Sequence, residues 1–447
     1  MEQKEGDSLI SGWLGTMAGR SAPTPPSANE TIKKAAAEVM AIQDVTFGGG
    51  EQPTRVRGTL IMPAEEAFKR LRSQFEAVGH TPHLRHEEGV DVIRALPVVF
   101  GKAAIPIRMA LILLVTTILS VFFVGLLNSG KLYDLPFNII LAQLTGNTKS
   151  VQFPSLLPSP EVWQAALVEA GLYALALISI LGAHEMGHFI VARYNKVQTT
   201  LPFFIPMPVP PLGTMGAVIA MREPAPNRKV QFDIGIAGPL AGLIVAIPLM
   251  FIGLSQSHVG TIAEQIKKTP PEVRDHLVFS SEGQSLLYLG IKYLVFGEAL
   301  PSGDRDVWIN GVAFAAWAGF FVTSLNLIPV GQLDGGHILY GLFGDRARRA
   351  RMPIIAVLAF LALAGIFDES TGLHLGFGWI GWGIWVAILL FMMRDHAPVL
   401  DEITHLDKKR QILGIVMLVV FLLLFMPTPL RVIVETPPQS LTWFWLI

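Results

Sequence analysis

The sequence predicts an all-α polytopic membrane protein with about seven transmembrane helices, a membrane-associated β-hairpin and a small α+β soluble domain before the first span. Three observations predict this class. Hydrophobic residues make up 51% of the 447 residues and charged residues only 15%, and the mean hydropathy of +0.49 is too high for an ordinary soluble domain. Apolar segments of bilayer length recur from residue 105 onwards. Residues 54–99 instead mix polar and apolar positions, as a small soluble unit does.

The charge balance and the lack of cysteine exclude several functions. The formal net charge is -1, so no basic field points to a nucleic-acid partner. The chain contains no cysteine, which excludes disulfides, thiolate metal ligands and a cysteine nucleophile. Any bound metal must therefore be held by His, Asp or Glu side chains. The expected surroundings are the lipid bilayer.

Residues 1–52 are rich in Ala, Ser, Pro, Gly and Glu and have no sustained apolar period, so we expect a disordered N-terminal segment. The first residues, MEQKEGDS, are polar and acidic, and no apolar run follows them. This pattern argues against a cleaved export signal and against an organelle transit peptide. The sequence therefore favours a multi-pass protein of a prokaryotic plasma membrane.

Residues 53–100 are expected to form a small α+β cytoplasmic domain. A strand-like stretch at 54–61 is followed by a helix-like stretch at 63–79 and by two extended stretches. The helix places apolar side chains on one face, at Phe68, Leu71, Phe75 and Val78. A packing domain, or a protein partner bound at residues 54–99, explains this unit better than a second active site.

Three histidines and an acid lie close together in this domain, at His80, His83, His86 and Glu87. A second metal site is one interpretation of this group. Spacings of three do not bring side chains to one face of a strand, where the period is two. A solvated strand or turn is therefore the favoured interpretation.

The core, residues 101–430, contains seven apolar stretches that are candidate transmembrane helices, because about 20 residues at 1.5 Å each cross a bilayer core of about 30 Å. Two shorter apolar stretches, at 132–144 and 286–297, are expected to be interfacial or re-entrant. Residues 431–447 are expected to form a C-terminal tail. The candidate spans are 105–127, 164–193, 231–254, 308–328, 352–366, 376–393 and 411–427.

Lys and Arg residues in the connecting loops set the expected orientation. If every candidate span crosses once, the basic residues near 193–196, 222–229, 346–351 and 394–410 all lie on one side. That side should be the cytoplasm, which also places the N-terminal domain in the cytoplasm.

One motif with known metal chemistry, HEMGH, lies near the cytoplasmic end of the second candidate span, at residues 184–188. Residues four apart lie on the same face of a helix, so His184 and His188 can offer two imidazole nitrogens to one zinc ion. Glu185 lies beside them as a general base for a zinc-activated water that attacks a peptide carbonyl. A buried structural network is the alternative, but ionisable groups at membrane depth are costly and tend to mark function.

A two-histidine site needs a third protein ligand, and NLIPVGQLDGGH at residues 326–337 offers Asp334. Pro329 and the glycines at 335 and 336 should interrupt the helix there, which is tolerated at membrane depth only against protein or a water-lined cavity. The alternative for Asp334 is a turn or helix-capping role. The alternative third ligand is His337.

Two further stretches bear on the surroundings of this site. Residues 202–221 contain many prolines and two glycines and are expected to form a hairpin that dips toward the site. Its edge could pair with an unwound substrate strand, or the stretch is a structural loop at the membrane interface. Gly235, Gly238 and Gly242 have the spacing of close helix packing, and we assign no chemistry to them.

With HEMGH and NLIPVGQLDGGH on separate membrane segments, the chain resembles the site-2 protease family of intramembrane zinc metalloproteases. The resemblance covers residues 103–430, includes PFFIPMPVPPLGTMGAVI, FDIGIAGPLAG and DEITHLDKKRQILG, and points to the cyanobacterial and chloroplast-like branch. It implies zinc bound by His184, His188 and Asp334, with Glu185 as the catalytic glutamate. It also implies that Asn326 assists near the scissile bond, and that the substrates are membrane-anchored proteins.

The resulting hypothesis is an intramembrane zinc metalloprotease that hydrolyses peptide bonds in or near transmembrane segments. Two alternatives remain open. A divalent-metal transporter would use the same His and Asp residues as a transit site. An inactive membrane scaffold of the same fold would bind partners through residues 54–99.

Overall fold

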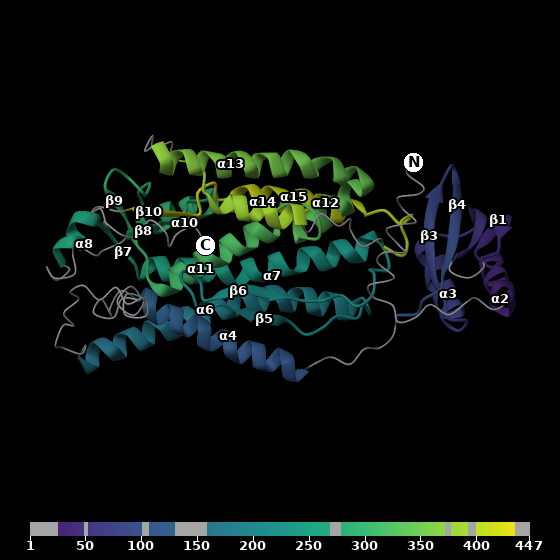
Figure 1. The fold of residues 1–447 in the computed structure, drawn as a ribbon, viewed down its shortest axis with the longest axis horizontal. Coiled ribbons are helices and arrows are strands. Elements are labelled where there is room, and N and C mark those ends of the chain that lie inside the picture. The colour runs from purple at the N-terminus through teal and green to yellow at the C-terminus, as the bar shows by residue number, and fades with distance from the viewer. Residues whose placement is uncertain are drawn as a thin grey trace.

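A computed structural model of the chain describes residues 26–48, 52–100, 107–129, 159–268, 279–371, 377–391 and 399–433. Long helices lie side by side along the longest axis of the molecule (Figure 1). A four-stranded sheet with two helices lies at one end, and short strand pairs lie at the other end. The described residues are mostly helical with small sheets, which confirms the coarse class predicted from the sequence.

The N-terminal unit, residues 26–100, is built from two helices and one antiparallel sheet. The strand order in the sheet is β1-β2-β4-β3. Its buried core contains Ile32 from the first helix and Phe68, Leu71 and Phe75 from the second. The bounds are α2 Pro26–Ala37, β1 Met40–Thr46, β2 Thr54–Leu60, α3 Ala64–Glu76, β3 Thr81–Glu87 and β4 Val90–Leu96.

This unit begins earlier in the chain than the sequence predicts. Disorder was expected through residue 52, but α2 and β1 lie within that segment, whereas residues 1–25 and 49–51 lie outside the described part. Helix α2 buries Ala35 and Ala36 beside Ile32, and β1 pairs with β2 along its length. The alanines that suggest low complexity in the sequence therefore allow α2 to pack closely against the rest of the N-terminal unit.

Each candidate span overlaps a helix, but a count of seven spans is not confirmed. Among the described residues, four helical stretches are long and apolar enough to cross a membrane: α4, α6, α7 and the continuous stretch from α12 into α13. Helices α10, α11 and α14 are apolar but shorter. The stretch expected at 286–297 is α10, and the stretch at 132–144 lies outside the described residues. The bounds are α4 Ile107–Asn128, α6 Pro160–Tyr194, α7 Arg228–Ser255, α10 Leu286–Phe296, α11 Gly311–Asn326, α12 Asp334–Phe343, η1 Gly344–Ala350, α13 Arg351–Thr371, α14 Gly381–Phe391 and α15 Lys408–Leu424.

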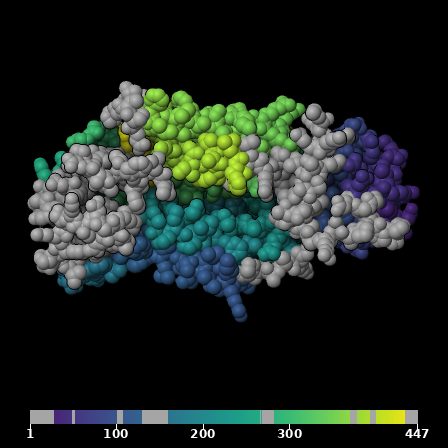
Figure 2. Space-filling model, viewed as in Figure 1, coloured from purple at the N-terminus to yellow at the C-terminus, as the bar shows by residue number. Residues whose placement is uncertain are grey.

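The outer helices present large apolar side chains to their surroundings. Exposed examples are Ile112 and Leu119 of α4 and Phe360 and Leu363 of α13. In the space-filling view, α4 and α13 lie on opposite sides of the helical layer (Figure 2). An exposed apolar surface of this extent is typical of a protein that faces lipid.

Helix α7 lies at the centre of the membrane core, where it contacts α6, α11 and α12. Small residues allow the close approach of these helices. Gly319 of α11 lies against Ile180 of α6, and Gly253 of α7 lies against the backbone of Ala313 of α11. Trp317 of α11 fills the space between the helices and is fully buried. This packing brings α6, α7 and the start of α12 together.

The hairpin expected at residues 202–221 is present. Strands β5 (Phe203–Pro206) and β6 (Thr214–Val218) pair antiparallel. Helix α4 packs against β5, and β6 contacts α4 and α6. Its side chains Met215 and Val218 are 68% and 52% exposed.

Two side chains tie the turn of this hairpin to neighbouring helices. The Ser120 hydroxyl of α4 donates a hydrogen bond to the Gly213 carbonyl, with 2.7 Å between the oxygens. The Tyr173 hydroxyl of α6 donates one to the Leu212 carbonyl at 2.8 Å. Gly213 has a φ of 83° and its α-carbon faces α4, where a side chain would collide with the backbone of Val121. The hairpin is therefore held in place at its turn.

The end of the core farthest from the N-terminal unit carries the two short strand pairs, β7 with β9 and β8 with β10. Lys292 of α10 is fully buried there. Its Nζ atom lies 3.3 Å from Glu282 Oε1 and 2.8 Å from Asp306 Oδ1, which compensates its buried charge. The bounds are β7 His258–Thr261, α8 Ile262–Lys268, β8 Phe279–Glu282, β9 Arg305–Trp308 and β10 Leu430–Ile433.

A segment late in the chain joins the N-terminal unit to the membrane core, and we call residues 399–404 the strap. Asp401 of the strap forms parallel β-bridges with Leu84 of β3 on one side and with Asn227, just before α7, on the other. Leu400 belongs to the hydrophobic core of the N-terminal unit. Val399 packs instead into a cluster of the membrane core. The strap thus lies between the two parts and belongs to both.

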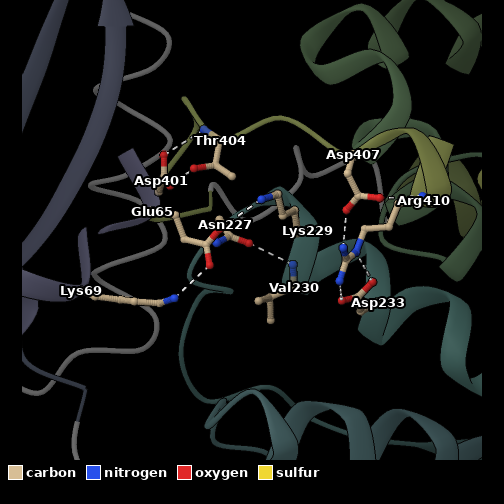
Figure 3. A network of polar contacts seen from close by, with 10 residues as sticks. All are labelled: Glu65, Lys69, Asn227, Lys229, Val230, Asp233, Asp401, Thr404, Asp407 and Arg410. Carbon is tan, nitrogen blue, oxygen red and sulfur yellow. Dashed lines mark hydrogen bonds and ion pairs between the residues drawn. The ribbon is translucent and has the colours of Figure 1, made fainter. Parts of the chain in front are cut away.

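Ion pairs add to this contact (Figure 3). Lys229 of α7 donates a hydrogen bond from Nζ to Glu65 Oε2 of the N-terminal unit at 3.0 Å. Arg72 of α3 pairs with Glu223 at 2.8 Å, and Glu223 is 2% exposed. Glu223 also accepts a hydrogen bond from the backbone N–H of Gln198. The N-terminal unit is therefore fixed both to the start of α7 and to the base of the hairpin.

Glu402 of the strap is held by two side chains of β3. It lies 3.2 Å from His83 Nε2 and accepts a hydrogen bond from Arg85 Nε at 2.9 Å. Burial raises the pKa of Glu402, but the hydrogen bond to His83 and the charge of Arg85 outweigh burial and hold that pKa below its usual range. The carboxylate form of Glu402 therefore stabilises the docked arrangement.

Candidate metal centre

Helix α6 carries two histidines one turn apart on the face toward α7. The spacing of four residues in this regular helix places both rings on one side. The Nε2 atoms of His184 and His188 are 3.2 Å apart. The two side chains are only 4% and 12% exposed. A pair of buried imidazoles this close indicates a shared ligand rather than two separate core histidines.

A turn between α11 and α12 carries the acid that the sequence singles out. Helix α11 ends at Asn326 and α12 begins at Asp334, so the helical path is interrupted where the proline and the two glycines predict. A Cβ atom at Gly335 would lie 1.9 Å from the Leu327 carbonyl oxygen. The turn therefore requires glycine at that position, and it directs Asp334 back toward α6.

Asp334 meets both histidines. Its Oδ2 atom lies 3.3 Å from Nε2 of His184 and 3.3 Å from Nε2 of His188. Zinc bonds of about 2.0–2.1 Å place neighbouring donor atoms of a tetrahedron about 3.3–3.4 Å apart, which agrees with these distances and with the 3.2 Å between the imidazoles. The donors therefore fit zinc. Three protein donors also leave a fourth position for water or substrate, as in catalytic zinc sites.

The structure groups no other His, Asp and Glu side chains of the described residues in a way that could hold a metal. His337, the alternative third ligand, lies outside the group, and Gln231 lies 3.1 Å from its Nδ1 atom. The histidines of the N-terminal unit do not converge either. His83 contacts Glu402, and His86 contacts Asp91 at 2.9 Å. His83 on β3 and His80, which directly precedes that strand, are buried rather than solvated as the sequence suggests.

Two neighbours of the metal group were expected to take part in chemistry. Glu185 follows His184 on α6 and is 6% exposed. The Asn326 side-chain amide lies 3.2 Å from His184 Nε2, so it is adjacent to the donor atoms. Asn326 is the last residue of α11, and the helix end therefore aims its amide into the site.

The sequence did not indicate the groups of α7 that surround the histidines. The Ile234 carbonyl accepts a hydrogen bond from His188 Nδ1 at 2.7 Å. A proton on Nδ1 leaves Nε2 unprotonated, which is the form that binds a metal. A backbone carbonyl has no side-chain signature, so only the glycine spacing of α7 could have pointed to this contact.

Comparison with known proteins agrees with this geometry. Residues 172–366 match the sequence profile of Peptidase family M50. That range contains the three donor residues, Glu185 and Asn326. No solved structure matches the chain at a significant level.

Curated relatives carry names that fit the same chemistry. The chain is 32% identical over 260 residues to "Probable zinc metalloprotease EGY2, chloroplastic" of Arabidopsis thaliana, which covers 57% of this chain and 41% of that protein. It is 29% identical over 324 residues to "Probable zinc metalloprotease EGY1, chloroplastic" of Oryza sativa subsp. japonica, covering 71% of this chain and 50% of the relative. The chain thus spans about half the length of these relatives.

Proposed function

We propose that the chain is an intramembrane zinc metalloprotease that hydrolyses peptide bonds in or near transmembrane segments of membrane-anchored proteins. The match of residues 172–366 to Peptidase family M50 supports this. One observation carries the proposal. His184, His188 and Asp334 bring three donor atoms within 4.8 Å of one another. The helices that carry them belong to two candidate membrane spans, which is where a protease acting on transmembrane segments needs its metal.

The chemistry follows from the donor set and its neighbours. Zinc, when bound there, would activate water and polarise the carbonyl of the scissile bond. The Glu185 carboxylate accepts the proton of the attacking water and returns it to the leaving amine. The Asn326 amide donates a hydrogen bond to the carbonyl oxygen as negative charge develops on it. The largely buried site excludes bulk water, which strengthens each of these interactions.

The hairpin is suited to presenting a substrate. A transmembrane helix hides its carbonyls in internal hydrogen bonds, so it must unwind before water can attack them. Helix α4 packs against β5, and β6 pairs with β5 along one edge while its Met215 and Val218 side chains are exposed. An unwound substrate strand that pairs with β6 replaces its lost helical hydrogen bonds by sheet hydrogen bonds.

The orientation of the chain rests on its basic loops. Lys and Arg residues at 193–196, 222–229 and 346–351 share the side of the N-terminal unit, and we propose that this side is the cytoplasm of a prokaryote. Cleavage then occurs near the cytoplasmic end of the substrate span. The curated relatives have chloroplastic names, so a plastid membrane with the stromal side in the same position is the alternative.

The test uses the purified full chain in liposomes with a single-span test substrate. We expect the wild type to cleave it, chelator to stop cleavage and added zinc to restore it. Glu185→Gln should bind zinc as the wild type does but show no cleavage. The matched control is Glu161→Gln, an exposed glutamate at the far end of the same helix, which should cleave normally. Cleavage that persists in Glu185→Gln or in chelator would contradict the proposal, and zinc flux without cleavage would support the transporter.

A further inference from the structure

Three glycines of α7 each face one histidine, two of them the metal-group histidines and the third His337 beside the group. We propose that the first half of α7 positions the metal-binding imidazoles, with Gly238 and the Ile234 carbonyl as the positioning groups. This inference rests on the proposed function only in that it concerns the same metal site. It replaces the expectation that the glycine spacing serves helix packing alone. The three pairs are Gly235 with His337, Gly238 with His188, and Gly242 with His184.

Gly238 leaves the space that the His188 ring occupies. A Cβ atom built on Gly238 would lie 2.1 Å from His188 Nε2 and 2.5 Å from both neighbouring ring carbons. The edge of the ring that would be struck is therefore the edge that carries the donor nitrogen. Any side chain at Gly238 must displace the atom that binds the metal.

The ring cannot withdraw without losing a second contact. On its opposite nitrogen, His188 Nδ1 donates to the Ile234 carbonyl at 2.7 Å. Ile234 and Gly238 are one helical turn apart on α7, so one turn of this helix holds both sides of the ring. A ring displaced by a side chain at Gly238 would stretch that hydrogen bond, turn Nε2 away from Asp334, or both.

The turn that carries Ile234 is itself fixed from outside the site (Figure 3). Asp233 accepts two hydrogen bonds from Arg410 of α15, each at 2.7 Å. One turn earlier, Lys229 binds Glu65 of the N-terminal unit. A bidentate pair holds the geometry of its backbone more strictly than a single contact does. The Ile234 carbonyl is therefore held in a fixed position relative to His188 of α6.

The contacts predict a graded effect. At Gly242, the added Cβ would lie 3.3 Å from His184 Cβ and Nδ1, a distance that a shift of a few tenths of an ångström relieves. At Gly253, farther along α7, the added Cβ would lie 2.3 Å from the Ala313 nitrogen. Gly253 is thus as crowded as Gly238 but faces no histidine, which makes it the matched control for packing.

The experiment measures zinc affinity of the purified full chain in detergent by competition with a chromophoric chelator, and the visible absorption of bound Co²⁺ as a report of coordination geometry. Gly238→Ala should weaken zinc binding about 10–100-fold, the range for groups that orient ligands, and change the Co²⁺ spectrum. Gly242→Ala should weaken it less. Gly253→Ala should lower the melting temperature and leave affinity and spectrum unchanged.

Asp233→Asn keeps the shape of the side chain and tests the same idea in a variant that is expected to fold. It should weaken zinc binding by a smaller factor than Gly238→Ala. The proposal is overturned if Gly238→Ala and Asp233→Asn both bind zinc within twofold of the wild type, or if Gly253→Ala weakens binding as much as Gly238→Ala. The zinc-binding measurement contains no substrate, so its outcome does not depend on proteolysis. A wild type that binds zinc but cleaves nothing in the liposome assay would contradict the protease proposal and leave this proposal unaffected.

Discussion

Arg85 of the N-terminal unit donates a hydrogen bond to Glu402 of the strap, although the two residues lie 317 positions apart in the sequence. The acceptor is 13% exposed and the donor 29%, so the pair is largely screened from water. This contact lies at the interface between the N-terminal unit and the membrane core, and it depends on the ionised carboxylate of Glu402.

Acid should therefore loosen the N-terminal unit. The pKa of Glu402 is held below its usual range, so its stabilising contribution is complete above the ordinary glutamate pKa of about 4.3 and is lost as the pH falls through the lowered value. Hydrogen exchange of the strap amides between pH 6 and pH 3 would measure this loss. Glu402→Gln should weaken docking by about 1.5–3 kcal/mol at neutral pH and reduce its pH dependence, with the remainder coming from the Lys229–Glu65 pair, whereas Glu88→Gln, at an exposed pair with Arg57, should change neither.

Leu400→Ala should destabilise the N-terminal unit rather than the strap alone. The Leu400 side chain is 2% exposed and lies in the core of that unit. Removing a buried leucine of this kind costs about 2–5 kcal/mol. Limited proteolysis of residues 26–100 should become faster in this variant. Leu363→Ala, at a 59% exposed site of α13, is the control, and equal sensitivity of the two variants would refute the assigned role of the strap.

Asp334→Ala should lose zinc more severely than any variant of a surrounding group. Removing one of three donors should exceed the about 100-fold loss that orienting groups can cause. Zinc content after dialysis against a weak chelator would measure the effect. His337→Ala should retain zinc because His337 lies outside the donor group. A reversed result would make His337 the third ligand.

Tyr173→Phe should reduce cleavage without reducing zinc content. The variant removes the hydrogen bond that ties the Leu212 carbonyl to α6, which is worth about 0.5–1.5 kcal/mol, and so loosens the hairpin turn. We expect kcat/KM for the test substrate to fall about two- to tenfold, the same free energy expressed as a rate. Tyr293→Phe, at a 57% exposed tyrosine of α10, should behave as the wild type. Unchanged kcat/KM in Tyr173→Phe would argue against a role for the hairpin.

The parts of the site that depend on local spacing could be predicted from the sequence. The one-turn spacing of His184 and His188 and the interruption before Asp334 are both local properties of the chain, and the structure brings these residues together as expected. The helices also overlap the apolar stretches. The number of helices that cross the membrane could not be predicted, because α11 and α14 have only 16 and 11 residues and an apolar length near the threshold does not decide whether a helix spans the bilayer.

The parts that depend on contacts between distant segments could not be predicted. Nothing near Leu400 in the sequence indicates that it completes a core formed by α3 and β3. The Ile234 carbonyl carries no side-chain identity at all. The sequence wrongly predicted disorder at α2 for another reason. This helix is rich in alanine and polar residues, a composition that is also typical of disordered segments. For Leu400 and Ile234, the role of the residue depends on a distant segment that it contacts, and its own neighbours in the sequence do not indicate that segment.

The strap also sets the order in which the molecule can be made. His83 and Glu402 are 319 residues apart, and a ribosome adding about 5–20 residues per second needs about 16–64 s to cover that distance. During that interval β3 has an unpaired edge, and the core of the N-terminal unit lacks Leu400. All three metal donors are synthesised before the strap, so a nascent chain can complete its metal site while the N-terminal unit still lacks Leu400 and Glu402. The metal site can therefore form before the N-terminal unit is fully docked.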